Sequence, residues 1–312
     1  MNIRYLKNEE LDTASWDACI QESMPSLLYA YSWYLDLVCD DWDALVLGDY
    51  EAVMPLPFTK KLGFKMALHP PFCQQLGVFS RSAVNESLVN AFLAAIPRRF
   101  RGVNLHLNYH NPLKSGVSRR SNYVLDLMPD MDELKTHFES SVIRSVRKSE
   151  KSSCALLEGI DLKSILELLA WQNKDKNMGI SSRSMRKLER LITVCTQKGV
   201  LISIGLYSPM NHLCAVAVFL KDRQRLYYLL GASDEIGREY AGMPRILLYL
   251  IEKFVGQGYT LDFEGSEIPG VARFFKKFGA KNSPYPVYSR QGFVMSCYFH
   301  SKNLILRNFL RK

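Results

Sequence analysis

The sequence predicts an α/β protein of two domains with mixed sheets, and three observations support this expectation. The 312 residues exceed what one hydrophobic core usually takes, so two domains of about 150 residues are expected. Residues 226–263 read as strand, loop, helix and strand, the order of a βαβ unit with parallel strands. Both halves repeat one order of elements, from helices through a run of strands to a helix and a further strand. We therefore place the domains at 1–129 and 130–312, packed side by side without a long linker.

The first half opens with helices and then changes to the alternating pattern of strands. Its helices carry apolar residues at intervals of three and four, and short turns such as Gly48-Asp49-Tyr50 separate its strands. A stiff loop at 70–77 reads Pro-Pro-Phe-Cys-Gln-Gln-Leu-Gly. The predicted elements are helices at 8–22 and 30–39, strands at 44–47 and 52–58, a helix at 83–96, and strands at 103–107 and 123–127.

The second half opens with a helix that runs from Asp130 through Lys151. Asp130 caps this helix, because Glu133 three residues later completes a capping box. A meander of strands and the βαβ unit follow. The remaining predicted elements are helices at 162–173 and 183–197, strands at 201–207, 213–220 and 226–231, a helix at 243–257, a strand at 259–263, a helix at 267–278, strands at 287–289 and 293–299, and a helix at 304–310.

The composition bounds the class of partner and the compartment. A net charge of +9 and a pI of about 9.1 favour anionic partners such as nucleotides, nucleic acid or acidic surfaces. Seven cysteines with no Cys-x-x-Cys spacing indicate unpaired thiols in a reducing cytoplasm. No apolar run is long enough to span a membrane, so we expect a cytoplasmic protein. His106 and His110 have no neighbouring cysteine or acidic partner, so no metal is expected.

The helix at 243–257 gives a strong signal. Its apolar residues form two rows at four-residue spacing, so one face must lie on a sheet. Pro244 suits the first turn, and Gly242 allows close approach of a ligand. A helix start offers free N–H groups to an anion, so a phosphate-bearing donor is one interpretation and an ordinary helix start is the other. The donor site would comprise Gly231, Ala232, Ser233, Tyr240, Gly242, Met243, Pro244 and Arg245.

An acidic turn follows the last strand of the βαβ unit. Glu264 lies between a buried strand and Gly265, so its carboxylate can reach a cleft and act as a general base. A helix cap or an ion pair is the structural alternative for this side chain. Asp262 alternates with Glu264 and is expected on the same face. Ser266 is expected to cap the next helix, with a catalytic role as the alternative.

Basic residues gather on one face of the helix that follows Asp130. Arg144, Arg147, Lys148 and Lys151 lie opposite its apolar row. They could hold a pyrophosphate, a tRNA or an anionic sugar nucleotide. A solvated helix face is the alternative.

Three motifs and the order of elements together resemble the FemAB-type proteins, which have two GNAT domains in tandem. Residues 141–151 resemble the Arg-x-x-x-Arg-Lys-x-x-Lys entry helix of that family, with one residue of difference in spacing. Residues 261–266 resemble its Asp-Phe-x-Gly strand end, and residues 274–280 its Phe-x-x-x-Phe-Gly helix end. The likeness covers residues 130–290 well, and the first half mainly through element order and the loop at 70–77.

The resemblance implies two GNAT-like domains, with an acyl donor lying between two splayed parallel strands of the second. The leading function is then N-acyl transfer from acetyl-CoA or another acyl-CoA to an amine, such as a cell-envelope or polysaccharide precursor. An aminoacyl-tRNA-dependent transferase is the first alternative, and a non-catalytic binding module of the same fold the second. A basic nucleic-acid binder is a further alternative, although no reader motif is present. The residues expected to hold the acceptor are Arg144, Arg147, Lys148, Ser266 and Lys276.

One residue departs from the family pattern. The peptidoglycan-bridge members often carry lysine directly after the first Phe of the last motif, whereas this chain has Phe275. The resemblance therefore favours the fold more than the aminoacyl-tRNA chemistry.

Overall fold

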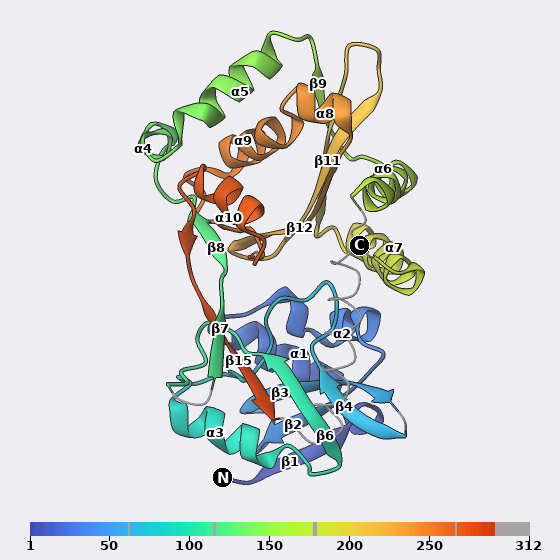
Figure 1. Ribbon diagram of the computed structural model, residues 1–312. Helices are drawn as coiled ribbons and strands as arrows, with labels where there is room; N and C mark the ends of the chain where they lie inside the picture. Colours follow the sequence, from blue (N-terminus) through green and yellow to red (C-terminus); the bar gives the residue numbers. More distant parts are fainter. Residues whose placement is uncertain (62, 115–116, 177–179, 266, 291–312) are drawn as a thin grey trace, which may run out of the picture. The chain divides into compact units, whose positions relative to one another are not determined.

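The computed structural model describes residues 1–61, 63–114, 117–176, 180–265 and 267–290 (Figure 1). Its contacts divide the chain into two units. The first unit is Met1–Arg120 together with the described residues from Tyr285, and the second is Ser121–Pro284. Each unit contains its own mixed β-sheet. The strands predicted at 293–299 and the helix at 304–310 lie outside the described residues.

The sheet of the first unit has the strand order β1-β2-β3-β4-β6-β15-β7, with β5 beside β3. Among the described residues of this unit, three helices and two 3-10 turns accompany the sheet. Its elements are β1 (Ile3–Lys7), η1 (Asn8–Glu10), α1 (Thr13–Glu22), η2 (Leu28–Ala30), α2 (Ser32–Val38), β2 (Asp41–Leu47), β3 (Ala52–Lys61), β4 (Phe64–Leu68), β5 (Phe79–Ser80), α3 (Glu86–Ala95), β6 (Phe100–His106), β7 (Val117–Arg120) and β15 (Tyr285–Arg290).

The parallel strands of the first unit, β4 and β6, stay connected beyond their last pair. The His69 N–H donates to the Asn104 carbonyl at 3.0 Å, and the Leu76 N–H donates to the His106 carbonyl at 2.9 Å. Leu76 also bridges Leu107 in parallel. The loop at 70–77 therefore fills the space between the ends of β4 and β6, where two parallel strands could separate.

The sheet of the second unit has the strand order β14-β8-β13-β12-β11-β10-β9. Figure 1 shows α6 and α7 on one face of this sheet and α9 and α10 on the other. The elements are β8 (Tyr123–Asp126), α4 (Met131–Thr136), α5 (Ser140–Glu150), β9 (Ala155–Glu158), α6 (Leu162–Asp175), α7 (Ser182–Gln197), β10 (Leu201–Tyr207), β11 (Leu213–Lys221), β12 (Arg225–Ser233), α8 (Glu235–Glu239), α9 (Gly242–Phe254), β13 (Thr260–Asp262), α10 (Pro269–Lys276) and β14 (Lys281–Asn282).

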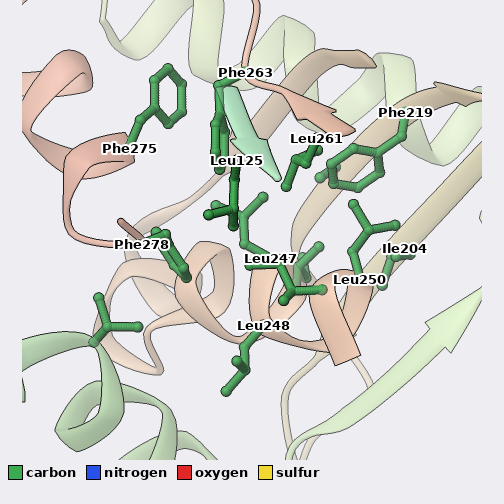
Figure 2. Close-up of a cluster of buried hydrophobic side chains, with 14 of the residues drawn as sticks. Leu125, Ile204, Phe219, Leu247, Leu248, Leu250, Leu261, Phe263, Phe275 and Phe278 are labelled. Carbon is green, nitrogen blue, oxygen red and sulfur yellow. The ribbon is translucent and has the colours of Figure 1, made fainter. Parts of the chain in front are cut away.

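The core of the second unit lies between the sheet and α9 (Figure 2). Leu247 and Leu250 of α9 are fully buried, as are Leu261 of β13 and Phe219 of β11. Each such side chain contributes about 1.5–3 kcal/mol when it leaves water. The rows of apolar residues predicted for this helix are therefore confirmed as the face that packs on the sheet.

One predicted helix differs from the structure because of a backbone hydrogen bond that the local pattern does not specify. The helix predicted from Asp130 through Lys151 is two helices, α4 and α5, because the Glu139 N–H donates to the Lys277 carbonyl at 2.8 Å. The predicted cap is present, since the Asp130 carboxylate accepts from the Glu133 N–H at 2.8 Å.

The division into units also differs from the boundary expected at residue 129. β8 precedes that residue but pairs with β13 in the second sheet. β15 lies far along the chain but pairs with β6 and β7 in the first sheet. Strand pairing thus joins segments that are distant in sequence, which local patterns cannot reveal.

Candidate functional site

The central strands β12 and β13 of the second unit pair only at their beginnings. The parallel register joins Arg225 to Thr260, Leu226 to Leu261 and Tyr227 to Asp262, and then β13 ends. β12 continues to Ser233. Its residues 228–231 are half-buried, whereas 226–227 and 232–233 are buried. A central strand covered on both faces would be buried throughout, so these residues border an opening between the two strands.

A β-bulge explains why β12 leaves β13 at this point. Tyr228 pairs with Phe219 of β11 and Leu230 pairs with Val218, so Leu229 is the extra residue. A bulge bends the strand that carries it and increases the local twist. The bend begins immediately after the last pair with β13, at Tyr227.

The first turn of α9 packs against the half-buried part of β12. The Tyr228 hydroxyl donates to Met243 Sδ at 3.4 Å. Gly231 lies beside the same hydroxyl, and a Cβ on Gly231 would be 1.9 Å from that oxygen. Burial raises the pKa of Tyr228 well above its usual range, so the phenol stays protonated. The structure thus brings together Gly231 and Met243, two of the residues predicted to bind the donor.

Arg245, another predicted donor residue, carries an unmet hydrogen-bonding group. Its Nη1 is buried and has no hydrogen-bond partner among the described residues. A buried guanidinium nitrogen without a partner is costly, so this position favours an anion. Arg245 lies in the first turn of α9, where Ala241 takes the N-cap without a side-chain hydrogen bond and no acidic residue is present. The helix start and the arginine therefore offer positive charge at one place.

The remaining predicted donor residues have mainly structural contacts. Ala232 and Ser233 are buried at the end of β12, and Tyr240 ends α8 half-buried. Pro244 is half-buried in the first turn of α9. Gly242 is buried, and a Cβ there would lie 2.6 Å from the Ala215 Cβ, so the glycine allows α9 to approach the sheet.

Asp262 is buried and anchors the acidic turn. Its Oδ2 accepts from Arg225 Nη1 at 2.6 Å, and its Oδ1 accepts from the Glu264 N–H at 2.8 Å. Asp262 is the last residue of β13, so the strand alternation expected between Asp262 and Glu264 does not extend that far. Glu264 is half-buried with φ of 56°, a left-handed conformation that is costly for a residue with a Cβ. Asp262 and Arg225 therefore hold Glu264 at the end of β13.

Phe275 fills the place where the FemAB pattern has a lysine. Its ring stacks on Phe263 with centroids 4.6 Å apart, and it meets Tyr228 edge-on at 5.9 Å (Figure 2 shows Phe263 and Phe275). Phe275 is buried in the hydrophobic core. The opening between β12 and β13 is thus bordered by aromatic rings, and no lysine reaches it from this position of α10.

The residues expected to bind the acceptor are dispersed over two helices. Arg144, Arg147 and Lys148 are exposed on α5, which packs against α9. Lys276 is exposed on α10, with Nζ 5.5 Å from the centroid of the Tyr123 ring. Ser266 lies outside the described residues. α10 begins only at Pro269, with Ile268 as its N-cap residue.

Sequence reasoning missed Arg225 and Tyr228. Arg225 begins an apolar strand and pairs with Asp262, which ends another apolar strand. Opposite charges in two strands that are otherwise apolar could have predicted a buried ion pair. Tyr228 gave no signal, because an aromatic residue within a strand is ordinary.

A histidine pair occupies the corresponding strand ends of the first unit. The rings of His69 and His106 stack with centroids 4.0 Å apart. The backbone N–H of His106 donates to Nδ1 of the His69 ring at 3.3 Å. Nε2 of His69 therefore carries the proton, and it donates to the Cys73 carbonyl at 2.8 Å. His106 Nδ1 donates to the Gln74 carbonyl, so its Nε2 accepts from Arg120 at 3.1 Å. Both rings are neutral in this arrangement.

The environment of the two histidines disfavours their charged forms. Burial lowers the pKa of His69 well below its usual value, and the neighbouring His106 adds to the effect. Burial and then the Arg120 charge lower the pKa of His106 to about 4. Across the described ranges, no group of three or more His, Cys, Asp or Glu side chains is placed to hold a metal ion. No helix within those ranges is long and apolar enough to cross a bilayer.

Comparison with known proteins gives a clear result only at the level of structure. No family model matches the sequence, and no curated protein sequence matches it. The structure of FemX is similar over 92% of this chain and 97% of FemX, with a TM-score of 0.65 and 15% identity. The C-terminal DUF2156 domain of a putative lysylphosphatidylglycerol synthetase from Agrobacterium fabrum is similar over 94% and 98%, with a TM-score of 0.55 and 9% identity.

A third structure carries the name of the predicted fold. It is a tandem GNAT protein from the clavulanic acid biosynthesis pathway, similar over 93% of this chain and 98% of that protein, with a TM-score of 0.53 and 11% identity. The chain therefore has the FemAB-like tandem GNAT fold, with two mixed α/β sheets, which confirms the predicted fold class.

Proposed function

We propose that the protein is an N-acyltransferase that moves an acyl group from an acyl-coenzyme A thioester, such as acetyl-CoA, to an amine. The observation that carries this proposal is the opening between β12 and β13, where residues 228–231 of a central strand are half-buried. An extended donor fits such an opening because the strand edge offers it backbone N–H and C=O groups. The similarity in fold to a tandem GNAT protein supports the same class of reaction.

The charge at the start of α9 supports a donor that carries phosphate. Arg245 Nη1 is buried without a hydrogen-bond partner among the described residues, and the helix start adds partial positive charge. A pyrophosphate bound there would supply the missing acceptor. Met243 and Gly231 would then line the path from the phosphates to the opening.

Glu264 is the proposed general base, and Asp262 is a positioning residue. As the amine nitrogen forms its bond to the thioester carbonyl carbon, Glu264 takes the proton that nitrogen loses. As the carbon–sulfur bond breaks, the carboxyl group returns that proton to the sulfur, so the products are an amide and a free thiol. Asp262 fixes the turn by accepting from the Glu264 N–H at 2.8 Å.

Calorimetry with coenzyme A tests the donor site. We expect the intact protein to bind coenzyme A and Arg245→Ala to bind it at least about tenfold more weakly, because a charge-assisted hydrogen bond to phosphate is lost. Arg273→Ala is the matched control, since Arg273 is exposed on α10 and its loss should leave affinity unchanged. Absence of coenzyme A binding by the intact protein would contradict the proposal.

An aminoacyl-tRNA-dependent transferase is the second candidate. The exposed basic residues Arg144, Arg147 and Lys148 of α5 favour it, because a row of phosphate contacts would use such a face. The resemblance of residues 141–151 to the FemAB entry helix points in the same direction, whereas Phe275 does not. Binding of tRNA that weakens steeply with salt, without binding of coenzyme A, would favour this candidate. The acceptor in either case is an amine, with a cell-envelope precursor as one source.

A further inference from the structure

Gln172 is a polar residue on the buried face of α6, and its side-chain amide bonds to the backbone of β12. Nε2 donates to the Gly231 carbonyl at 3.2 Å, and Oε1 accepts from the Ser233 N–H at 2.9 Å. The residue is only 6% exposed, and Ile165 and Leu169 on the same helix are buried beside the sheet. A side chain that both donates to and accepts from one strand behaves like a peptide group of an additional strand.

Gln172 occupies the edge of β12 that faces away from β11. Residues two apart in a strand direct their N–H and C=O groups to the same side, and the Ser233 N–H donates to Gln172 rather than to β11. The next strand of the sheet on that side is β13, which stops pairing with β12 after Tyr227. The side chain therefore takes up part of the edge that β13 leaves open.

We propose that the Gln172 side chain occupies, in the free protein, the hydrogen-bonding position on β12 that the donor takes when it binds. In the free protein its amide keeps the edge of β12 paired at Gly231 and Ser233, and an amide of an extended ligand replaces it when the ligand binds. The inference rests on the proposed function, because the ligand is an acyl-coenzyme A, whose arm between the phosphates and the sulfur carries two secondary amides. Each amide offers one donor and one acceptor, the same pair that Gln172 supplies.

Displacement of Gln172 affects the end of α6. Lys176, the C-cap residue of this helix, has its Nζ 3.4 Å from Gln172 Oε1. Asp175 lies 3.8 Å from Arg238 on α8. When Gln172 leaves the strand, the last turn of α6 loses the two hydrogen bonds that this side chain makes to β12. Donor binding therefore protects the Ser233 amide while it loosens the end of α6.

The test compares coenzyme A binding by the intact protein, Gln172→Ala and Asn173→Ala. Gln172→Ala removes the group that the donor must displace, so we expect coenzyme A to bind roughly threefold to tenfold more tightly. Asn173→Ala is the matched control, because Asn173 is the next residue and, within the part of the chain that the structure describes, its side chain bonds to the backbone of Ile180 and not to β12. Its affinity for coenzyme A should equal that of the intact protein. Gln172→Met has a similar length but can neither donate to Gly231 nor accept from Ser233 as an amide does, so it should also bind more tightly and serves if the alanine variant does not fold.

Amide hydrogen exchange gives a second measurement on the same proteins. In the free protein the Ser233 amide should exchange slowly, in free Gln172→Ala it should exchange fast, and coenzyme A should restore its protection. Residues 170–176 should exchange faster in the intact protein when coenzyme A is bound. Equal or weaker affinity in Gln172→Ala, while the intact protein binds coenzyme A, would overturn the inference and leave the proposed function standing. Failure of both proteins to bind coenzyme A would overturn both.

Discussion

Glu264 shows what a single residue contributes to the candidate site. It follows Asp262, the last residue of β13, and Phe263, both of which are buried. Its own backbone nevertheless has a left-handed φ of 56°. Such a conformation costs a residue with a Cβ about 1–2 kcal/mol, so a glycine would be preferred on stability alone. Strained residues of this kind gather at functional sites. Glu264 thus combines a carboxylate side chain with a backbone conformation that costs conformational free energy, which is consistent with a role at the site.

Glu264→Gln tests the proposed general base. We expect kcat for acyl transfer to fall by roughly 10²-fold or more, because the amide cannot take a proton. The free energy of unfolding should change by less than about 0.5 kcal/mol, since Gln has the same shape. Steady-state kinetics and urea denaturation measure the two quantities. Glu252→Gln, on the exposed side of α9, should change neither.

If Glu264→Gln retained full activity, Glu264 would be a structural residue of the turn. In that event the variant would be expected to lose stability while kcat stayed constant.

For single residues, the sequence predicted several side chains of the candidate site but not their burial, backbone conformation or contacts. Arg245 and Glu264 were expected at the site, and the structure gives both an unusual setting. Gly242 was expected to allow close approach of a ligand, and the structure adds that its missing Cβ also allows α9 to approach Ala215 of the sheet. Gln172 could have been noticed as an amide on an apolar helix face, but its partner strand lies 59 residues away along the chain. Contacts at such separations follow from the fold and not from local pattern.

Among the elements, β12 and β13 are joined by an ion pair in addition to their backbone pairing. Arg225 begins β12 and Asp262 ends β13, with 2.6 Å between Nη1 and Oδ2. The side chains are 14% and 1% exposed, so water does little to screen either charge. The pair therefore fixes the two strands at the point before they separate.

Arg225→Met tests this role. Removal of the arginine leaves the Asp262 carboxylate buried without its cation, so we expect a loss of about 3–5 kcal/mol in the free energy of unfolding. Urea denaturation of the variant and of the intact protein measures the difference. Arg223→Met, an exposed residue in the preceding turn, is the control and should change stability by less than about 0.5 kcal/mol. A small effect of Arg225→Met would mean that backbone pairing and packing hold β12 and β13 together without the ion pair.

Element prediction succeeded where the periodic pattern was long. α9 and α7 were expected at 243–257 and 183–197, and the structure has them at Gly242–Phe254 and Ser182–Gln197. It failed for short, polar strands such as β7, whose Val117–Arg120 sequence has three polar residues in four. The opening between β12 and β13 was also beyond local pattern, because it depends on a bulge against β11.

For the molecule as a whole, the histidine pair makes stability depend on pH. Unfolded histidine binds a proton near its ordinary pKa of 6.5, whereas His106 in the folded protein binds one only near pH 4. Between these values the unfolded state holds more protons, so the free energy of unfolding falls as the pH is lowered from about 6.5 towards 4. His69 changes stability in the same direction.

His106→Gln should reduce this dependence. The slope in the middle of the window should decrease by about 1.4 kcal/mol per pH unit, the value for one proton. Urea denaturation at several pH values between 4 and 7 measures the slope. His110→Gln, an exposed neighbour, should leave it unchanged. An unaltered slope in His106→Gln would show that the imidazole takes up its proton equally well in the folded state.

The two-unit organisation was predicted from length and from the repeated order of elements, and the fold class is confirmed. The boundary was placed at residue 129, in the Met128-Pro129-Asp130 segment after β8, whereas contacts divide the chain after Arg120. The composition of a segment can reveal a domain boundary only where a loop connects the two hydrophobic cores. Here two strands, β7 and β8, follow each other directly and belong to different sheets.

The return of β15 to the first sheet has a consequence for the order of events during synthesis. β15 lies between β6 and β7, so this sheet keeps an empty place until residues 285–290 have left the ribosome. The whole of Ser121–Pro284 has emerged before then, with every strand of its own sheet. Although domains generally fold from the N-terminus onwards, the unit that begins this chain is the one that must wait. A truncated chain that ends at Pro284 would thus hold every strand of the second sheet but lack β15 of the first, and limited proteolysis should cut its first unit while sparing its second.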